Sequence, residues 1–162
     1  MASAGQLHPE LEVGDVLLGD RAFCSFFHVV LLVSQGIHGI FRAHQKLIVD
    51  FTPGRAHAHP RRGKNASRKG LPRSKWIRSC GRQDQIVEWF KPVNVPNWMP
   101  TAAFAAAPET IRVRELKYRV ARPGFRVREV TLVTTLCDEV VYSAADLAAA
   151  YGLRWTIRAI AP

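Results

Sequence analysis

Two groups of residues in this chain have the types and spacing that phosphate chemistry needs, and the first is at Asp20. This residue follows the apolar stretch 13–18 in the segment Gly19-Asp20-Arg21-Ala22-Phe23, so its carboxylate is expected where a buried strand ends. A carboxylate at the carboxyl end of an inner strand is a common metal ligand or catalytic acid. An Asp in front of a helix can instead cap backbone N–H groups of the first turn. Taken alone, Asp20 leaves both roles open.

The second group lies near the end of the sequence. Tyr151, Arg154 and Arg158 are spaced by three and four residues, so they share one face of a helix. An arginine on such a face can bind phosphate oxygens through its planar fork of donors. The structural alternative makes Tyr151 a core aromatic packed on Leu147 and Arg154 a solvated charge.

The elements around Asp20 predict an α/β fold. A strand is expected over 13–18, a helix over 22–35 that stops at Gly36, a strand over 39–43 and a further candidate strand over 46–51. This alternation of strand and helix is typical of an α/β layer.

Downstream, the pattern predicts a sheet and a final helix. Strands are expected over 86–90, 111–120 and 125–136, the last two joined by a turn at Pro123-Gly124. The alternation over 111–114 predicts one apolar face and one face carrying Arg112 and Arg114. A capping pattern at Ser143 and Asp146 begins a helix expected over 144–157.

The charge indicates a polyanionic partner. Lys and Arg total 23 against 13 acidic residues, which gives a net charge of +10 and a pI near 10.3. Between Asp50 and Asp84 the sequence has no acid but ten cations, which are Arg55, Arg61, Arg62, Lys64, Arg68, Lys69, Arg73, Lys75, Arg78 and Arg82. This basic tract, 55–82, is expected to be a loop, or a segment that orders on binding. We favour contact with DNA phosphates over an ordinary solvated loop.

Several residues keep two interpretations. Arg21 could neutralise Asp20 or bind a phosphate, and the sequence does not decide. Trp76 could stack on an unpaired base, although packing is the more common use for a tryptophan, as for Trp89 and Trp98. His57 and His59 lack a well-placed third ligand for a metal, even with His44 nearby.

Other classes of protein fit the sequence poorly. The longest apolar stretch, 26–33, is far shorter than the roughly 20 residues of a membrane span. The first ten residues lack the pattern of a secretory signal, so we expect a cytoplasmic protein with no membrane partner. Cys24, Cys80 and Cys137 are odd in number and widely spaced, which favours reduced thiols.

Together, Gly19 to Phe23 and Tyr151 to Ile157 resemble the DDE transposases of bacterial insertion sequences, in the branch with a YREK signature. The resemblance implies DNA transposition, which is metal-dependent strand cleavage and transfer at transposon ends, on a ribonuclease H-like core. It implies a core strand-helix-strand at 11–54, a basic loop and β-rich insertion at 55–136, and a core helix at 137–162. Asp20 would be a catalytic residue and a ligand of Mg²⁺.

The resemblance also implies further roles. Tyr151 and Arg154 would contact transposon-end DNA beside Asp20, with added contacts from Arg61, Arg62, Lys64, Arg68, Lys69, Arg73 and Lys75. Asp20 is therefore expected to lie at the end of its strand, facing the Tyr151–Arg154 side of the last helix.

The sequence departs from the family pattern at two positions. Arg158 stands where the family has its catalytic Glu, and the nineteen residues before Asp20 do not supply the first catalytic Asp. We therefore expect a truncated, partial core of marginal stability that does not cleave DNA by itself. Its partners would be double-stranded DNA and another copy of itself or a full-length transposase. The alternatives are a non-catalytic DNA-binding module and a basic RNA-binding protein.

Overall fold

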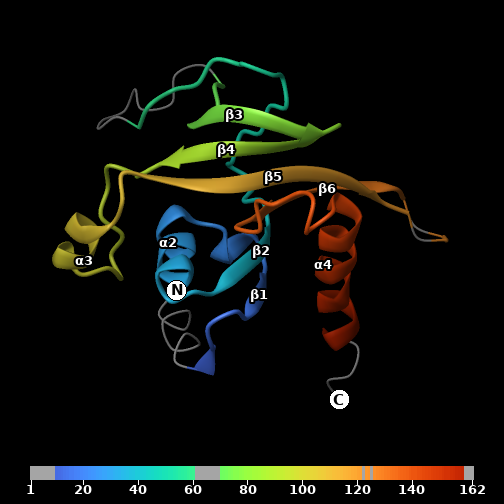
Figure 1. The fold of residues 1–162 in the computed structure, drawn as a ribbon, viewed down its shortest axis with the longest axis horizontal. Helices are drawn as coiled ribbons and strands as arrows, with labels where there is room; N and C mark the ends of the chain where they lie inside the picture. The colour runs from blue at the N-terminus through green and yellow to red at the C-terminus, as the bar shows by residue number, and fades with distance from the viewer. Residues whose placement is uncertain (1–9, 61–69, 122, 125, 159–162) are drawn as a thin grey trace.

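The computed structural model describes residues 10–60, 70–121, 123–124 and 126–158, with backbone alone for 155–158. The first half contains β1 (Val16–Gly19), a 3-10 turn (Arg21–Phe23), α2 (Phe26–Ser34), β2 (His38–Arg42) and β3 (Ser74–Gly81). The second contains β4 (Asp84–Phe90), α3 (Thr101–Ala106), β5 (Thr110–Val120), β6 (Arg128–Thr134) and α4 (Ala144–Arg158). The described strands form one mixed sheet in the order β1-β2-β6-β5-β4-β3, so the chain is mixed α/β (Figure 1).

The predicted strand-helix-strand unit at the start of the chain is confirmed. β1 pairs in parallel with β2, from Val16 opposite His38 to Gly19 opposite Phe41, and α2 connects the two strands. The helix begins later than expected, because Arg21–Phe23 form a 3-10 turn and Ser25 caps the helix by accepting the His28 N–H on its side chain. It ends as expected before Gly36, whose positive φ of 72° suits glycine.

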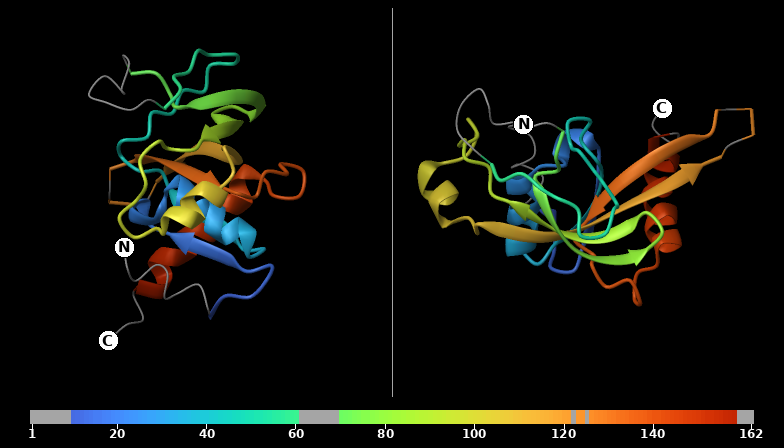
Figure 2. Two further views of the ribbon diagram at one scale, coloured as in Figure 1. Left: turned by 90° about the vertical axis from the view of Figure 1, so that its left-hand side faces the viewer. Right: turned by 90° about the horizontal axis from the view of Figure 1, so that it is seen from above.

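Helices pack on both faces of the sheet. Phe27 and Leu32 of α2 pack in one cluster with Phe41 and Val133, whereas Leu147 and Tyr151 of α4 pack in another with Ile40 and Leu132. Neighbouring residues of a strand point to opposite faces, so α2 and α4 cover opposite sides of β2 and β6. Figure 2 shows the sheet running between these helices.

The boundaries expected at 54/55 and 136/137 do not interrupt the sheet. β6 pairs directly with β2, with Ile40 opposite Thr134, and β5 pairs with both β6 and β4. A single sheet therefore carries the elements that precede and follow the basic tract.

The expected strand over 46–51 is wrong. The chain turns at Gln45–Lys46 and then runs irregularly to Asp50. The Asp50 carbonyl accepts hydrogen bonds from Arg55 Nε at 2.7 Å and from Gln85 Nε2 at 3.1 Å. One side chain nearby in the sequence and one distant side chain thus satisfy the Asp50 carbonyl, while the second side of β2 is taken by β6.

Part of the basic tract is a strand rather than the expected loop. β3 contains Lys75 and Arg78 and pairs with β4 along its length, from Ser74 opposite Trp89 to Gly81 opposite Asp84. It forms an outer edge of the described sheet, where charged side chains discourage pairing with other chains. The helix α3 was not predicted from the sequence.

The expected basic face of β5 is also wrong at Arg114. Arg112 is exposed as predicted, but Arg114 is buried with only 1% of its surface accessible. Its Nε and Nη2 bind the two carboxylate oxygens of Asp84 at 2.8 and 2.6 Å, and its Nη1 donates to the Tyr142 carbonyl at 2.6 Å. The loop before α4 covers this part of the sheet, so the cation is buried with its counter-ion.

Candidate functional site

Asp20 and Arg154 come together in the fold although they are 134 positions apart. The Arg154 Nη2 donates a hydrogen bond to Asp20 Oδ2 at 3.1 Å, and the two side chains form an ion pair. The Asp20 side chain is 37% exposed and the Arg154 side chain 19%, so the pair lies at the surface with solvent access. The expectation that Asp20 ends a strand facing the Arg154 side of the last helix is confirmed.

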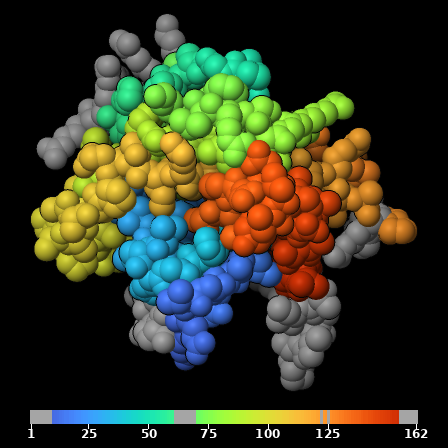
Figure 3. Space-filling view, viewed as in Figure 1, coloured from blue at the N-terminus to red at the C-terminus, as the bar shows by residue number. Residues whose placement is uncertain are grey.

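Local packing explains how Asp20 reaches this position. Asp20 directly follows β1, and its Oδ1 accepts a hydrogen bond from the Arg21 N–H at 2.7 Å, so the residue also caps the 3-10 turn. The structural role that was an alternative for Asp20 therefore coexists with the contact to Arg154. In the space-filling view, the blue atoms of the β1 region and the red atoms of α4 lie next to each other (Figure 3).

Both contacts act on the acidity of Asp20. The Arg21 backbone N–H, and then the Arg154 guanidinium, lower the pKa of this carboxyl, while partial burial opposes them. The carboxylate is therefore ionised at neutral pH, with one oxygen held by the backbone and the other by an arginine.

Glycine 19 makes room for this turn. A Cβ atom at Gly19 would lie 2.3 Å from the Phe41 ring, which stands opposite it on β2, and a Cβ at Gly39 would lie equally close to the same ring. The fully buried ring therefore lies across both glycines. This explains in structural terms why a glycine precedes Asp20.

Tyr151 is in the core rather than at the DNA-facing surface that the resemblance implies. Its side chain has 0% accessible surface and packs with Ile40, Leu116 and Leu147. Burial raises the pKa of its hydroxyl, and the nearby Arg154 guanidinium partly offsets this. The hydroxyl forms no hydrogen bond of normal geometry with the described residues. Tyr151 thus supports the helix that carries Arg154, as the structural alternative proposed.

Arg21 points to a neighbour other than Asp20. Its Nη1 donates to Gln45 Oε1 at 3.3 Å, and its charge is the smallest of the influences that lower the pKa of Asp20. Gln45 was not identified from the sequence, because nothing in its surroundings marks it as a partner of a residue 24 positions away. The site therefore holds one carboxylate that is bound by Arg154, and the Arg21 side chain is directed to Gln45.

The described residues do not fit a two-metal site. No group of three or more His, Cys, Asp or Glu side chains in the described part of the chain is arranged to hold a metal ion. Asp20 supplies one carboxylate, and Arg154 competes for it. A two-ion phosphodiester site needs several acidic oxygens around both ions.

The cations of the basic tract differ in burial and in their binding partners. Arg55 is buried and donates to the Ser74 carbonyl at 2.6 Å and to Ser74 Oγ at 2.8 Å, so it is structural. Arg78 forms a bidentate ion pair with Glu139. Arg73 and Lys75 are exposed. The predicted DNA contacts Arg61, Arg62, Lys64, Arg68 and Lys69 lie outside the described residues.

The aromatic residues and histidines near the tract mostly serve packing. Trp89 is buried and its Nε1 donates to Glu115 Oε1 at 3.1 Å, whereas Trp76 is half-buried and Trp98 is 36% exposed. The rings of His57 and His59 pack against Phe90.

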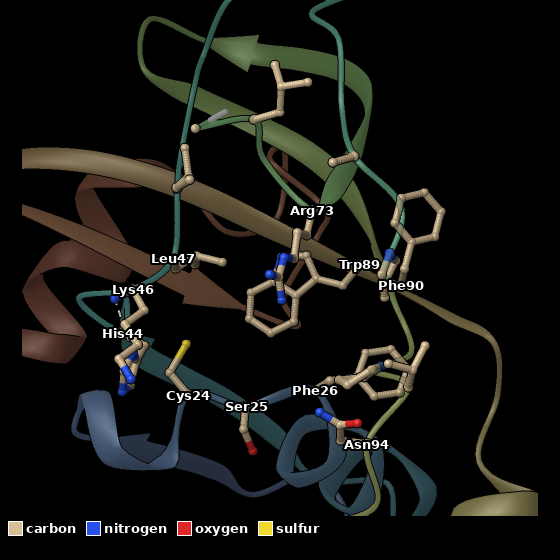
Figure 4. A pocket seen from close by; sticks show the side chains of 17 residues that line it. Cys24, Ser25, Phe26, His44, Lys46, Leu47, Arg73, Trp89, Phe90 and Asn94 are labelled. Atoms are coloured by element: carbon tan, nitrogen blue, oxygen red, sulfur yellow. Dashed lines mark hydrogen bonds between the residues drawn. The ribbon is translucent and has the colours of Figure 1, made fainter. Parts of the chain in front are cut away.

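A separate pocket of about 630 Å³ lies between the start of α2, the segment 44–48 and the end of β4. Its walls include Cys24, Phe26, Trp89 and the cations Lys46 and Arg73, as Figure 4 shows. Burial raises the pKa of Cys24 to about 12, so its thiol is protonated at neutral pH. The pocket contains neither Asp20 nor Arg154, and its chemistry is that of an apolar recess with cations beside it.

No family model, curated protein or solved structure matches this chain. Among the described residues, no helix has the length and apolar character needed to cross a membrane.

Proposed function

We propose that this chain is part of the catalytic domain of a DDE-type transposase and binds the double-stranded DNA of transposon ends. The contact between Asp20 and Arg154 carries the proposal. The two sequence segments that resemble the family, far apart along the chain, supply the two side chains of one solvent-accessible site. The parallel β1-α2-β2 unit with α4 packed on its sheet is compatible with a partial ribonuclease H-like core.

Arg154 is the residue best suited to hold a DNA phosphate. A guanidinium has several N–H donors in a fixed fork, and it binds phosphate oxygens in the same way as carboxylate oxygens. In the free protein the guanidinium binds Asp20 at 3.1 Å. A phosphate that approaches this site would compete with Asp20 for Arg154, with Arg21 as a second nearby cation.

Strand cleavage in this family depends on divalent ions, which activate the attacking oxygen and stabilise the leaving oxygen. Among the described residues only Asp20 is placed to bind such ions, so we assign no cleavage step to these residues. What they supply is a cationic site that positions a phosphate beside a carboxylate. The activity that this site supports best is therefore DNA binding, and a non-catalytic DNA-binding module is the nearest alternative.

The test is a binding titration by fluorescence anisotropy with labelled duplex DNA, duplex RNA and single-stranded DNA over a salt series. We expect tight binding to duplex DNA, with the logarithm of the association constant falling linearly with the logarithm of salt concentration. Arg154→Ala should weaken this binding, whereas Arg112→Ala, which removes an exposed cation on β5, should change it less. Absence of binding at low salt, or a preference for RNA, would overturn the proposal.

A further inference from the structure

The hairpin of β5 and β6 extends beyond the rest of the sheet. β4 pairs with β5 only as far as Leu116, and β2 pairs with β6 only as far as Leu132. Beyond these points the ladder pairs the two strands only with each other, up to Val120 opposite Arg128. The nearest backbone hydrogen bonds to other segments are Lys117 N–H to the Gln83 carbonyl and Ala43 N–H to the Thr131 carbonyl. We call residues 117–121 and 126–130 the β5–β6 arm, and Figure 2 shows it projecting beside α4.

The base of the arm is fixed to the helix that carries Arg154. Tyr118 and Val130, opposite each other in the register, pack against the cluster that contains Leu147 and Tyr151 of α4. At the same level, the Lys117 N–H donates to the Gln83 carbonyl at 2.9 Å. The direction of the arm is therefore set relative to the Asp20–Arg154 site.

The outer part of the arm is exposed and basic. Residues 117–130 contain five Lys or Arg and a single acid, Glu129. Glu129 lies 3.7 Å from Lys117 Nζ, and in the described part of the chain Arg119, Arg126 and Arg128 have no such carboxylate partner. All three arginines are exposed, and so is Val127 at 51%.

A free two-stranded ribbon gains little stability from burial, because two strands alone are marginal in water. Its outer edges also carry unpaired backbone groups, which invite pairing with other chains unless charge discourages it. An exposed cationic ribbon thus fits a polyanion better than a second protein strand. The major groove of DNA is about 12 Å wide and admits a two-stranded ribbon, whose arginines can reach the flanking phosphates.

We propose that the β5–β6 arm binds duplex DNA in the major groove, as a second contact separate from the Asp20–Arg154 site. The proposal rests on the DNA-binding function above and adds to it a groove contact whose direction is fixed by the packing of Tyr118 on α4. Arg126 and Arg128 bind phosphates at the outer part of this contact.

The test compares two double variants with the same loss of charge. Arg126→Ala with Arg128→Ala removes cations from the arm, and Lys46→Ala with Arg112→Ala removes exposed cations that lie outside both the arm and the basic tract. Each lost phosphate contact lowers the salt slope of DNA binding by about 1. We therefore expect the arm variant to lower the slope by about 2 and the control to change it by less than half of that. Methyl green, a major-groove ligand, should compete with the wild type more strongly than netropsin, a minor-groove ligand.

The outcomes separate this proposal from the proposed function. If the wild-type chain binds no duplex DNA, both fail. If it binds DNA but the two double variants behave alike, or netropsin is the stronger competitor, the arm proposal fails and DNA binding stands. Sedimentation of the DNA-free proteins checks the remaining case, since a change of oligomeric state in the arm variant alone would identify the arm as a protein interface and overturn the proposal.

Discussion

The Arg154 guanidinium binds the Asp20 carboxylate at 3.1 Å because β1 and α4 both pack against β2. β1 pairs with β2 along one edge, and α4 packs on Ile40 of the same strand through Leu147 and Tyr151. The end of β1 and the second half of α4 are thereby brought to one place at the surface.

The first prediction concerns the exchange of Asp20 for a phosphate on Arg154. Asp20→Asn removes a negative charge from the site, so it should tighten duplex DNA binding by about fivefold, which corresponds to roughly 1 kcal/mol between charges about 4 Å apart in water. The gain should disappear when Arg154 is already replaced by Ala. Anisotropy titrations of the two single variants and the double variant measure this coupling.

The control for Asp20→Asn is Glu109→Gln, which removes one negative charge from a side chain that is 86% exposed. If both substitutions tighten binding equally, or if Asp20→Asn keeps its effect without Arg154, the competition between carboxylate and phosphate is contradicted.

The second prediction separates packing from DNA contact at Tyr151. The ring is fully buried and its hydroxyl makes no regular hydrogen bond among the described residues, so Tyr151→Phe should leave stability unchanged or slightly higher. Tyr151→Ala should cost about 3–5 kcal/mol through the cavity it creates. Urea unfolding measures both values. A clear loss of DNA affinity in a stable Tyr151→Phe variant would instead assign the hydroxyl a role in DNA binding.

The third prediction concerns the close approach of Phe41 to Gly19. Gly19→Ala places a methyl group 2.3 Å from the ring, so it should destabilise the fold by about 1–3 kcal/mol through overpacking. Phe41→Leu in the same chain should recover part of this loss. Gly81→Ala is the matched control, because its new Cβ would meet only Asp84 Cβ at 3.9 Å. Additive effects of Gly19→Ala and Phe41→Leu in unfolding experiments would show that the ring is not the obstacle.

The fourth prediction is a pH dependence caused by Glu115, which has 0% accessible surface. Burial raises the pKa of this carboxyl, although Trp89 and Gln85 donate hydrogen bonds to it at 3.1 and 2.9 Å. The folded state therefore holds this proton more tightly than the unfolded chain. The contribution of Glu115 to the free energy of unfolding is therefore largest below the pKa of the unfolded chain, near 4.5. It falls as pH rises toward the pKa of the folded state.

The free energy of unfolding, measured by urea at several pH values, should show this trend as the difference between wild type and Glu115→Gln. Carboxyls with a lowered pKa, such as Asp20, stabilise the fold less as pH falls. Their contribution to the free energy of unfolding is the same in both proteins, so it cancels in this difference. We expect the wild type to lose stability relative to Glu115→Gln as pH rises above about 4.5. A constant difference across this range would contradict the raised pKa.

Local sequence patterns were sufficient for most of the elements. The apolar run before Asp20, the periodicity of 26–34, the alternation along 110–120 and the cap at Ser143 depend on neighbouring residues, and each produced an element close to its predicted position. The proximity of Asp20 and Arg154 was also predicted, but from the family resemblance rather than from any local pattern.

What the sequence could not determine depends on contacts between distant residues. Arg114 looks like a surface cation by alternation, and only its pairing with Asp84 under the loop before α4 makes it a buried one. The segment 46–51 looks like a strand, but the position beside β2 is occupied by β6, and Arg55 and Gln85 satisfy the Asp50 carbonyl instead. Burial and strand neighbours are properties of the whole fold. The periodicity of the sequence therefore predicted where helices and strands form, whereas only the tertiary structure determined which charged side chains remain exposed to a partner.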